Sequence, residues 1–178
     1  MKPWIQTFTG KAFWPLDPDP ADVRIEDIAH ALSMKCRYSG HTKRFYSVAE
    51  HSVHVSDGVA PEFALWGLMH DASEAYLPDV ARPIKAQMPG FVEIEAKVMA
   101  AVCKAYGIEG AEPPEVKAAD YAILHDEKFA LMDPEAMPWE LTGQPLGAII
   151  YAWRPEEAKQ QFLTRFFQLI EAKNADAA

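Results

Sequence analysis

Residues 68–79 are Leu68-Met69-His70-Asp71-Ala72-Ser73-Glu74-Ala75-Tyr76-Leu77-Pro78-Asp79. They place an adjacent histidine and aspartate, and a glutamate one helical turn later, inside an otherwise apolar segment. Burying an imidazole and carboxylates among leucine, methionine and alanine costs free energy unless each group has a partner. One divalent metal ion satisfies several such groups at once, and His51 and Asp120 complete a plausible ligand set. The pattern therefore predicts a metal site inside a helical domain.

The composition is that of an ordinary globular domain. Of the 178 residues, 49% are hydrophobic and 24% charged, and we expect one domain spanning residues 1–178 around a single core. The net charge of -9 argues against a protein that follows nucleic-acid backbones, which needs a basic surface. It does not exclude a small anionic substrate, because a metal ion and a few arginines can reverse the local field.

Cysteine content and hydropathy indicate the compartment. Cys36 and Cys103 are the only cysteines, they form no CxxC motif, and no secretory leader is recognisable, so we expect a cytoplasmic protein. No apolar run approaches the roughly 18 to 20 residues that cross a bilayer. We therefore expect no membrane partner.

The predicted fold is all-α, a single helical bundle with a short N-terminal β-hairpin. Residues 1–20 form the hairpin extension, because aromatic-rich stretches flank Thr9-Gly10. Ser47 and Glu50 form a capping box that begins a helix ending near residue 56. We expect an apolar, central helix over residues 61–77. The core spans residues 22–132, and residues 133–178 add an irregular connection and a C-terminal helix. The other helices are predicted over 23–34, 91–106, 113–132 and 155–172.

Helical periodicity indicates which side chains face the core. His51 borders the apolar stripe of its helix, and His54 lies only about 60° further round, so geometry prefers His51 weakly. Asp120 lies directly on a core face, where an aspartate needs a cation or several donors. His70 and Asp71 lie on the central helix, within reach of both neighbours. Three helices could thus each aim part of one ligand set inward.

Each of these residues also has a structural interpretation. An inward histidine is more often a satisfied core residue than a ligand, and a buried aspartate is usually a cap or an ion-pair partner. A second pair, His125-Asp126, is followed by Glu127-Lys128, and we interpret it as solvated surface. The four candidate ligands together are harder to explain without a metal. Mixed imidazole and carboxylate ligands suit Zn, Mn, Fe, Co or Ni.

Two acidic residues follow the His-Asp pair. Glu74 lies one turn after His70 on the same face, where it could exchange protons with a metal-activated water or a leaving oxygen. Asp79 is a second candidate acid just past the predicted helix end. The structural alternatives are an ion-paired glutamate and a turn aspartate. With a metal site, these acids indicate a metal-dependent hydrolase.

These motifs resemble the HD-domain superfamily of metal-dependent phosphohydrolases, whose pattern is His…His-Asp…Asp. The run His70-Asp71-Ala72-Ser73-Glu74-Ala75-Tyr76-Leu77-Pro78-Asp79-Val80-Ala81-Arg82-Pro83-Ile84-Lys85 is similar to a segment of small bacterial 5'-deoxynucleotidases. Ser47-Val48-Ala49-Glu50-His51-Ser52 and Val116-Lys117-Ala118-Ala119-Asp120 resemble the segments with the first and last ligands. The resemblance covers roughly residues 22–132. It implies a divalent metal held by His51, His70, Asp71 and Asp120, proton transfer by Glu74 and assistance from Asp79.

The resemblance also implies substrate contacts. Arg37 and Tyr38 resemble an Arg-aromatic pair that contacts phosphate and sugar, with tyrosine here in place of tryptophan. Lys85 is a further candidate for neutralising the phosphate. Gly40-His41-Thr42 and the hairpin are more similar to small phage-associated HD phosphohydrolases, and His41 would contact an extended phosphate chain or cap a loop. Trp14 would line a base pocket or, alternatively, pack on the core or on another subunit.

Two substrate classes stay open at this point. A deoxynucleoside monophosphate would release orthophosphate and a triphosphate would release tripolyphosphate, with a second Mg or Mn ion able to arrive with the substrate. The alternatives are a nucleotide-binding regulatory module without turnover and a purely structural protein. Glu74 disfavours the regulatory module, because a pure binder does not need the acid. Aromatic residues among the first 20 positions also predict a homo-oligomer.

Overall fold

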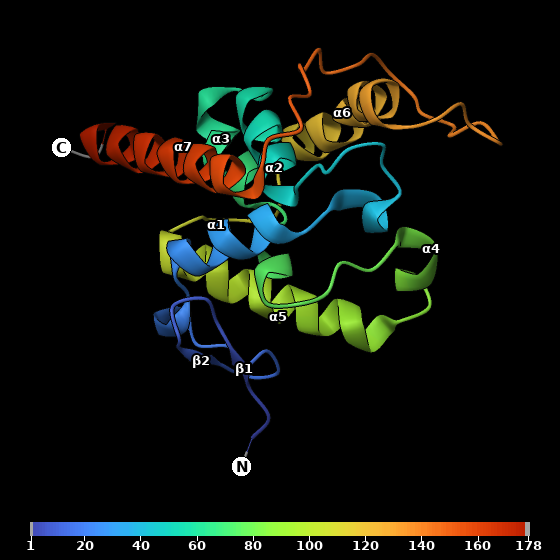
Figure 1. Cartoon of the computed structure of the whole chain (residues 1–178). Coiled ribbons are helices and arrows are strands. Elements are labelled where there is room, and N and C mark those ends of the chain that lie inside the picture. Colours follow the sequence, from blue (N-terminus) through green and yellow to red (C-terminus); the bar gives the residue numbers. More distant parts are fainter. Residues whose placement is uncertain (1, 177–178) are drawn as a thin grey trace.

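The computed structural model describes residues 2–176 and is mostly helical, with 58% helix (Figure 1). Seven α-helices and one two-stranded antiparallel sheet form the regular structure of these residues, besides short 3-10 turns. This confirms the predicted helical class with a hairpin. The helices are α1 Ile25–Met34, α2 Val48–Asp57, α3 Ala64–Met69, α4 Arg82–Lys85, α5 Pro89–Tyr106, α6 Pro114–Leu131 and α7 Pro155–Asp176.

The N-terminal hairpin is present and packs on the core. Strand β1 (Ile5–Gln6) pairs with β2 (Ala12–Phe13). Phe13 is fully buried and stacks on Tyr76 with ring centroids 3.9 Å apart. Thr9 at the hairpin turn donates its N–H and its hydroxyl to Asp27 of α1 at 2.7 and 3.0 Å. These contacts hold the hairpin below α1 and α5 in Figure 1.

Some aromatic side chains of the hairpin remain exposed. Trp4 is 46% and Phe8 55% exposed, although Phe8 also stacks on His30 of α1 at 3.7 Å. The homo-oligomer stays a prediction. Sedimentation at several protein concentrations tests it, and a single monomeric species throughout would contradict it.

The central helix is α2, and not the segment 61–77. Every residue from Val48 to Ser56 is buried, and α2 contacts α1, α3, α6 and α7. As predicted, the Oγ of Ser47 caps the helix by accepting a hydrogen bond from the Glu50 N–H at 3.0 Å. Helix α3 crosses α2 closely at Gly67, where a Cβ would lie 3.0 Å from the Cα of Ser56. The missing side chain lets the end of α3 approach α2.

The single helix predicted over residues 61–77 is wrong. The segment divides into a 3-10 turn Pro61–Phe63, helix α3 and a 3-10 turn Ala72–Ala75. Asp71 leaves helical geometry with φ of -100° and ψ of 11°. The interruption therefore lies at the predicted ligand pair, where the demands of the site override an apolar helical pattern.

The chain after this segment follows the prediction more closely. Pro83 occupies the first turn of helix α4, where a proline removes no N–H that the helix needs. Gly107 ends α5 with a left-handed φ of 60°, as expected of a C-terminal glycine. Helix α7 continues to Asp176, beyond its predicted end at residue 172.

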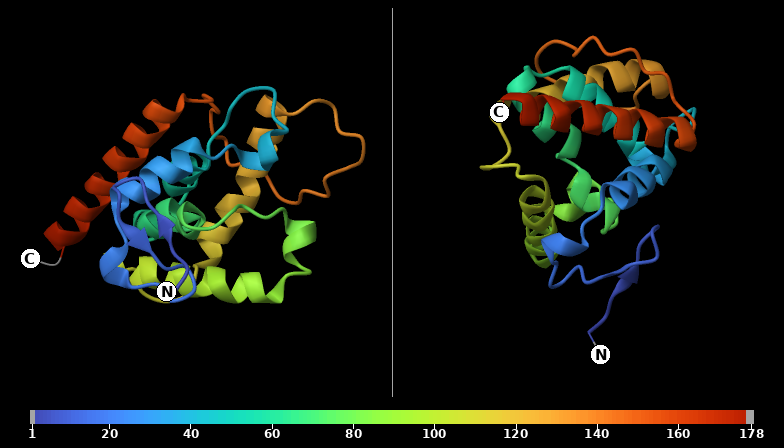
Figure 2. Two further views of the ribbon diagram at one scale, coloured as in Figure 1. Left: turned by 60° about the horizontal axis from the view of Figure 1, so that its bottom comes forward. Right: turned by 90° about the vertical axis from the view of Figure 1, so that its left-hand side faces the viewer.

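Three segments with little regular structure lie on the side of the molecule away from the C-terminal end of α7 (Figure 2). They are residues 35–46, residues 78–88, which include α4, and the first part of the connection 133–154. Within residues 2–176, none of the helices has the length and apolarity that a membrane crossing needs.

A buried carboxylate fixes the end of the irregular connection. Glu50 of α2 is fully buried and accepts hydrogen bonds from the N–H groups of Tyr151, Ala152 and Trp153 at 2.9, 2.8 and 2.6 Å. Ala152 has φ of 57°, a conformation that non-glycine residues seldom adopt. Glu50 thus satisfies three backbone donors, which need an acceptor once they leave water.

We predict that Glu50→Gln lowers the free energy of unfolding by about 2–3 kcal/mol. One carboxylate oxygen becomes an amide NH₂, which then faces a backbone N–H that has lost its acceptor. Chemical unfolding measures the change. Glu93→Gln, at an exposed position of α5, is the matched control. Equal stability of the two variants would contradict a stabilising role for the hydrogen bonds that Glu50 accepts.

Candidate metal centre

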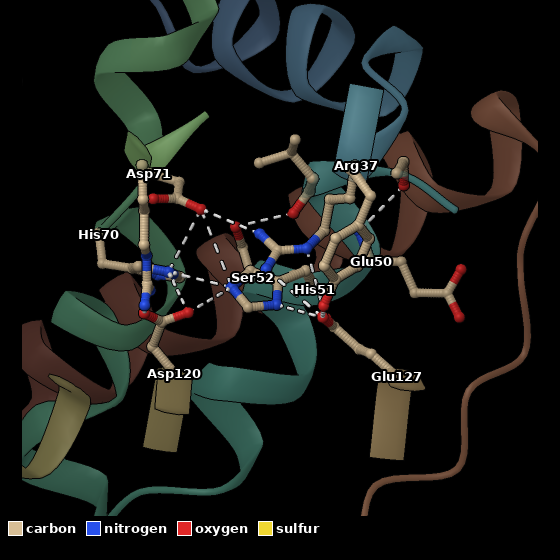
Figure 3. Close-up of polar contacts among 12 residues, drawn as sticks. Arg37, Glu50, His51, Ser52, His70, Asp71, Asp120 and Glu127 are labelled. Atoms are coloured by element: carbon tan, nitrogen blue, oxygen red, sulfur yellow. Dashed lines mark hydrogen bonds and ion pairs between the residues drawn. The ribbon is translucent and has the colours of Figure 1, made fainter. Parts of the chain in front are cut away.

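Side chains from three parts of the chain converge at one point (Figure 3). His51 comes from α2, His70 directly follows α3, and Asp120 comes from α6. The Nε2 atom of His51 lies 3.2 Å from Nε2 of His70 and 3.2 Å from Oδ1 of Asp120. The Nε2 atom of His70 lies 4.0 Å from the same oxygen. These three residues form a group that could hold a metal ion.

Asp71 brings a further carboxylate close to the two histidines, although it lies outside the group formed by His51, His70 and Asp120. Its Oδ2 lies 3.4 Å from Nε2 of His70 and 3.8 Å from Nε2 of His51. Ligand atoms about 2.0–2.2 Å from one ion lie roughly 3.0–3.5 Å apart at tetrahedral or octahedral angles. The spacings of 3.2, 3.2 and 3.4 Å lie in that range, and those of 3.8 Å (Asp71 to His51) and 4.0 Å (His70 to Asp120) are longer. Two imidazole nitrogens and two carboxylate oxygens are a donor set for Zn, Mn, Fe, Co or Ni.

The second nitrogen of each histidine has its own partner. Nδ1 of His70 is 2.8 Å from the carbonyl oxygen of Gly67, and Nδ1 of His51 is 2.7 Å from Oε1 of Glu127. Both partners accept hydrogen bonds, so each Nδ1 is assigned as the protonated donor. With Nδ1 as the donor, each Nε2 faces the convergence point, where a metal ion would replace any proton that Nε2 carries. Metal-ligating histidines in proteins are generally oriented in this way.

Glu127 is a component of the site that the sequence pattern did not indicate. The solvated surface predicted around His125-Asp126 is wrong. Glu127 is fully buried, and Asp126 accepts hydrogen bonds from the N–H groups of Gly147 and Ala148 at 2.9 and 3.2 Å. The missed signal is spacing: Glu127 lies two helical turns after Asp120, on the same face of α6.

Glu127 joins the ligand set to Arg37 and Tyr38. The Nε of Arg37 lies 3.4 Å from Oε1 of Glu127 and the Nη2 lies 3.4 Å from Oε2, while Nη1 lies 3.5 Å from Oδ2 of Asp71. The Tyr38 hydroxyl donates to the same Oε2. One buried carboxylate thus contacts a candidate ligand histidine, an arginine and a tyrosine. The arginine in turn reaches Asp71.

The charges of the site favour a cation at the convergence point. Burial opposes protonation of His51, and Arg37 opposes it too, but Glu127 and Asp120 prevail and raise its pKa to about 9. Burial likewise opposes ionisation of Glu127, but Arg37 and His51 lower its pKa to about 2. Asp120 is held ionised in the same way, with a pKa below its ordinary range despite burial. Buried carboxylates in this number need positive charge, and a divalent ion supplies it.

A cavity of about 730 Å³ opens beside the convergence point and is lined by Asp71 and Asp120. The structure brings six further predicted site residues to its lining, which are Arg37, Tyr38, His41, Glu74, Asp79 and Lys85. Lys85 is paired with Glu95 of α5 at 2.6 Å. Trp14 lies in the hairpin and is not among the lining residues. His54, the alternative to His51, packs instead against Trp153 with ring centroids 5.6 Å apart.

Glu74 lines the cavity with an altered acidity. Burial, followed by the charges of Asp71 and Asp79, raises the pKa of Glu74 from 4.5 to about 8. The segment that carries Glu74 is fixed by Lys35, whose ammonium group donates hydrogen bonds to the backbone carbonyls of Glu74 and Leu77. A carboxylic acid that keeps its proton near neutral pH is suited to donate it to a leaving group.

We predict a pH-dependent stability of the metal-free protein because of this acid. Its raised pKa contributes stability that is complete below about pH 4.5 and is lost as the pH rises through about 8. Glu74→Gln removes the ionisation, so its free energy of unfolding relative to the parent protein rises across that range, by about 1.4 kcal/mol for each pH unit. Urea unfolding after chelator treatment at about pH 5 and pH 9 measures this. A difference independent of pH would show that Glu74 ionises normally.

Comparison with family models gave no match for this chain. The uncharacterized protein YfdR of Escherichia coli is 37% identical over 173 residues, which cover 96% of this chain and 97% of YfdR. The uncharacterized protein RCAP_rcc00048 of Rhodobacter capsulatus is 37% identical over 190 residues, which cover 95% of this chain and 96% of that protein. Identity at this level extends over almost the whole length of each protein. The chain therefore belongs to the same family as YfdR and RCAP_rcc00048.

Proposed function

We propose that this protein is an HD-type, metal-dependent phosphohydrolase that acts on deoxyribonucleotides. One observation carries the proposal: the Nε2 atoms of His51 and His70 and carboxylate oxygens of Asp71 and Asp120 converge beside a cavity. The order of these residues, His51, His70-Asp71 and Asp120, is the pattern by which the sequence resembles the HD superfamily. A helical structure with this group is compatible with an HD-type fold.

The chain's own residues would supply the rest of the chemistry. When bound, a divalent ion activates a water molecule and stabilises charge on phosphoryl oxygens. Glu74 would hold the proton that the leaving oxygen needs, and Asp79 lines the cavity beside it. Arg37, fixed by Glu127 and Asp71, presents a planar guanidinium suited to phosphate oxygens. Lys85, which also lines the cavity, would supply a second positive charge.

Product analysis of the purified protein tests the proposal. The protein is incubated with Mn, Co or Zn and a panel of deoxynucleoside mono- and triphosphates, and the phosphate products are separated. Orthophosphate from monophosphates indicates a 5'-nucleotidase, and tripolyphosphate from triphosphates indicates a triphosphohydrolase in which His41 is the next residue to test. No product from either substrate class, with the metal bound, would overturn the proposal in favour of a regulatory binding module.

A further inference from the structure

The cavity beside the metal centre is lined by apolar as well as charged side chains, and the proposed chemistry uses only the charged ones. Besides acidic and basic residues, the lining includes Tyr38, Leu124, Met132 and Trp139. These four come from residues 35–46, from α6 and its end, and from the connection 133–154. Trp139 was not among the residues indicated by the sequence. A ligand that fills the cavity therefore meets both charged and apolar side chains.

We propose that Trp139 and Tyr38 form an aromatic wall on which the base of a nucleotide stacks. The inference rests on the proposed function for the phosphate end of the ligand, and on these separate side chains for the base. Aromatic faces attract nucleobases because every base offers a planar π-face. The wall would determine that this site acts on nucleotides rather than on small phosphate esters in general.

Tyr38 is held rigidly enough to serve as one part of the wall. Its backbone is in the left-handed region with φ of 56°, and Ser39 follows with φ of 52°. Such conformations cost free energy outside glycine and persist where the surroundings enforce them. The Tyr38 hydroxyl is bonded to the buried carboxylate of Glu127, so this polar group is already engaged. A ligand would therefore contact the aromatic ring of Tyr38 rather than its hydroxyl.

Trp139 is held beside Tyr38 from a distant part of the chain. The two ring centroids lie 5.8 Å apart at an angle of 44°. Lys128 of α6 places its Nζ 5.8 Å from the Trp139 ring and also pairs with Glu135 of the connection. Lys128 thus ties the connection to α6 at Glu135 and at Trp139.

The spacing of the rings determines how a base would bind. A base inserted between two parallel rings needs about 7 Å, twice the contact distance of roughly 3.5 Å. The observed 5.8 Å and the tilt exclude insertion without movement, so the base lies against the wall formed by both rings. A wall of this kind contacts the face of a base rather than its hydrogen-bonding edge. We therefore expect all four bases to be accepted, with purines binding more tightly because of their larger face.

The test compares deoxyadenosine monophosphate with deoxyribose 5-phosphate, which lacks the base. For Trp139→Ala we expect KM for the nucleotide to rise at least about tenfold, with kcat retained, because stacking is lost. Both constants for the sugar phosphate should stay unchanged, and Trp139→Phe should recover most of the nucleotide KM. Met137→Ala is the matched control, since Met137 is 77% exposed on the same segment and does not line the cavity. An unchanged KM for the nucleotide in Trp139→Ala, or an equal rise in KM for both substrates, would contradict stacking of the base on Trp139.

Binding of deoxyadenosine, followed by ligand NMR, separates this inference from the proposed function. The nucleoside has no phosphate, so its binding does not depend on hydrolysis. Suppose that neither phosphate substrate is hydrolysed, but that the nucleoside binds the parent protein and not Trp139→Ala. The inferred base-binding role of Trp139 is then supported, and the proposed function is contradicted. Equal binding of the nucleoside by the parent protein and by Trp139→Ala would contradict the base-binding role, whether or not the protein hydrolyses phosphate esters. Circular dichroism verifies folding, and Trp139→Phe supplies a second variant if the alanine protein is unstable.

Discussion

Asp71→Asn is expected to lose the metal ion and the hydrolytic activity together. The Asp71 oxygen lies 3.4 and 3.8 Å from the Nε2 atoms of the two histidines, so the substitution removes charge directly at the convergence point. Replacing a group that merely supports a ligand costs about ten- to hundredfold in metal affinity. We expect a larger loss for Asp71, which we propose as a ligand itself. Metal analysis and the product assay on the same preparation measure both effects.

Two comparison variants make this result specific. Glu74→Ala should keep the metal and lose turnover, because Glu74 lines the cavity without belonging to the converging atoms. Asp133→Asn, at a side chain that is 84% exposed and paired only with Lys43, should change neither. A folded Asp71→Asn protein with full metal content would reduce the ligand set to His51, His70 and Asp120. Full activity in Glu74→Ala would remove Glu74 from the mechanism.

Glu127→Gln is expected to weaken both metal binding and folding. The carboxylate orients His51 through a 2.7 Å hydrogen bond and balances Arg37, whose side chain is only 15% exposed. Removing one partner of a buried ion pair costs about 3–5 kcal/mol, because the remaining charge stays uncompensated. Loss of the oriented histidine should lower metal affinity about ten- to hundredfold. Urea unfolding and calorimetric titration of the chelator-treated protein with Zn measure the two effects.

A readout on His51 itself distinguishes positioning from a general loss of structure. The Nδ1–H···Oε1 bond to Glu127 fixes the tautomer of His51 in the metal-loaded protein, so nitrogen NMR should report protonated Nδ1 and a coordinated Nε2. In Glu127→Gln this preference should weaken. An unchanged His51 spectrum and an unchanged metal affinity in the folded variant would contradict the positioning role.

The grouping of His51, His70 and Asp120 could be predicted because these residues carry strong local signals. Asp120 lies on an apolar face with Val116 and Ile123, and all three are arranged on α6 as the periodicity indicates. The choice of His51 over His54 depended on the resemblance more than on the geometry. In the structure nearly every residue of α2 is buried, so both histidines face packed surroundings and the apolar stripe could not separate them.

What the sequence could not predict depends on contacts between distant segments. Glu127 resembles a surface glutamate until Arg37, Tyr38 and His51 are brought to it from elsewhere in the chain. Trp139 lies in a segment without periodicity, so no pattern indicates that it lines the cavity. The interruption of helix 61–77 at Asp71 has a similar cause: helical propensity is a weak preference, and the tertiary surroundings of the site override it.

Metal content measured together with activity is the most direct test of the central claim. We expect the purified protein to carry a divalent ion whose X-ray absorption spectrum shows nitrogen and oxygen ligands at about 2.0–2.2 Å. Chelator treatment should remove the ion and the phosphohydrolase activity together, and adding the ion back should restore both. Undiminished hydrolysis by a demonstrably metal-free protein would contradict the assignment of His51, His70, Asp71 and Asp120 as a catalytic metal centre.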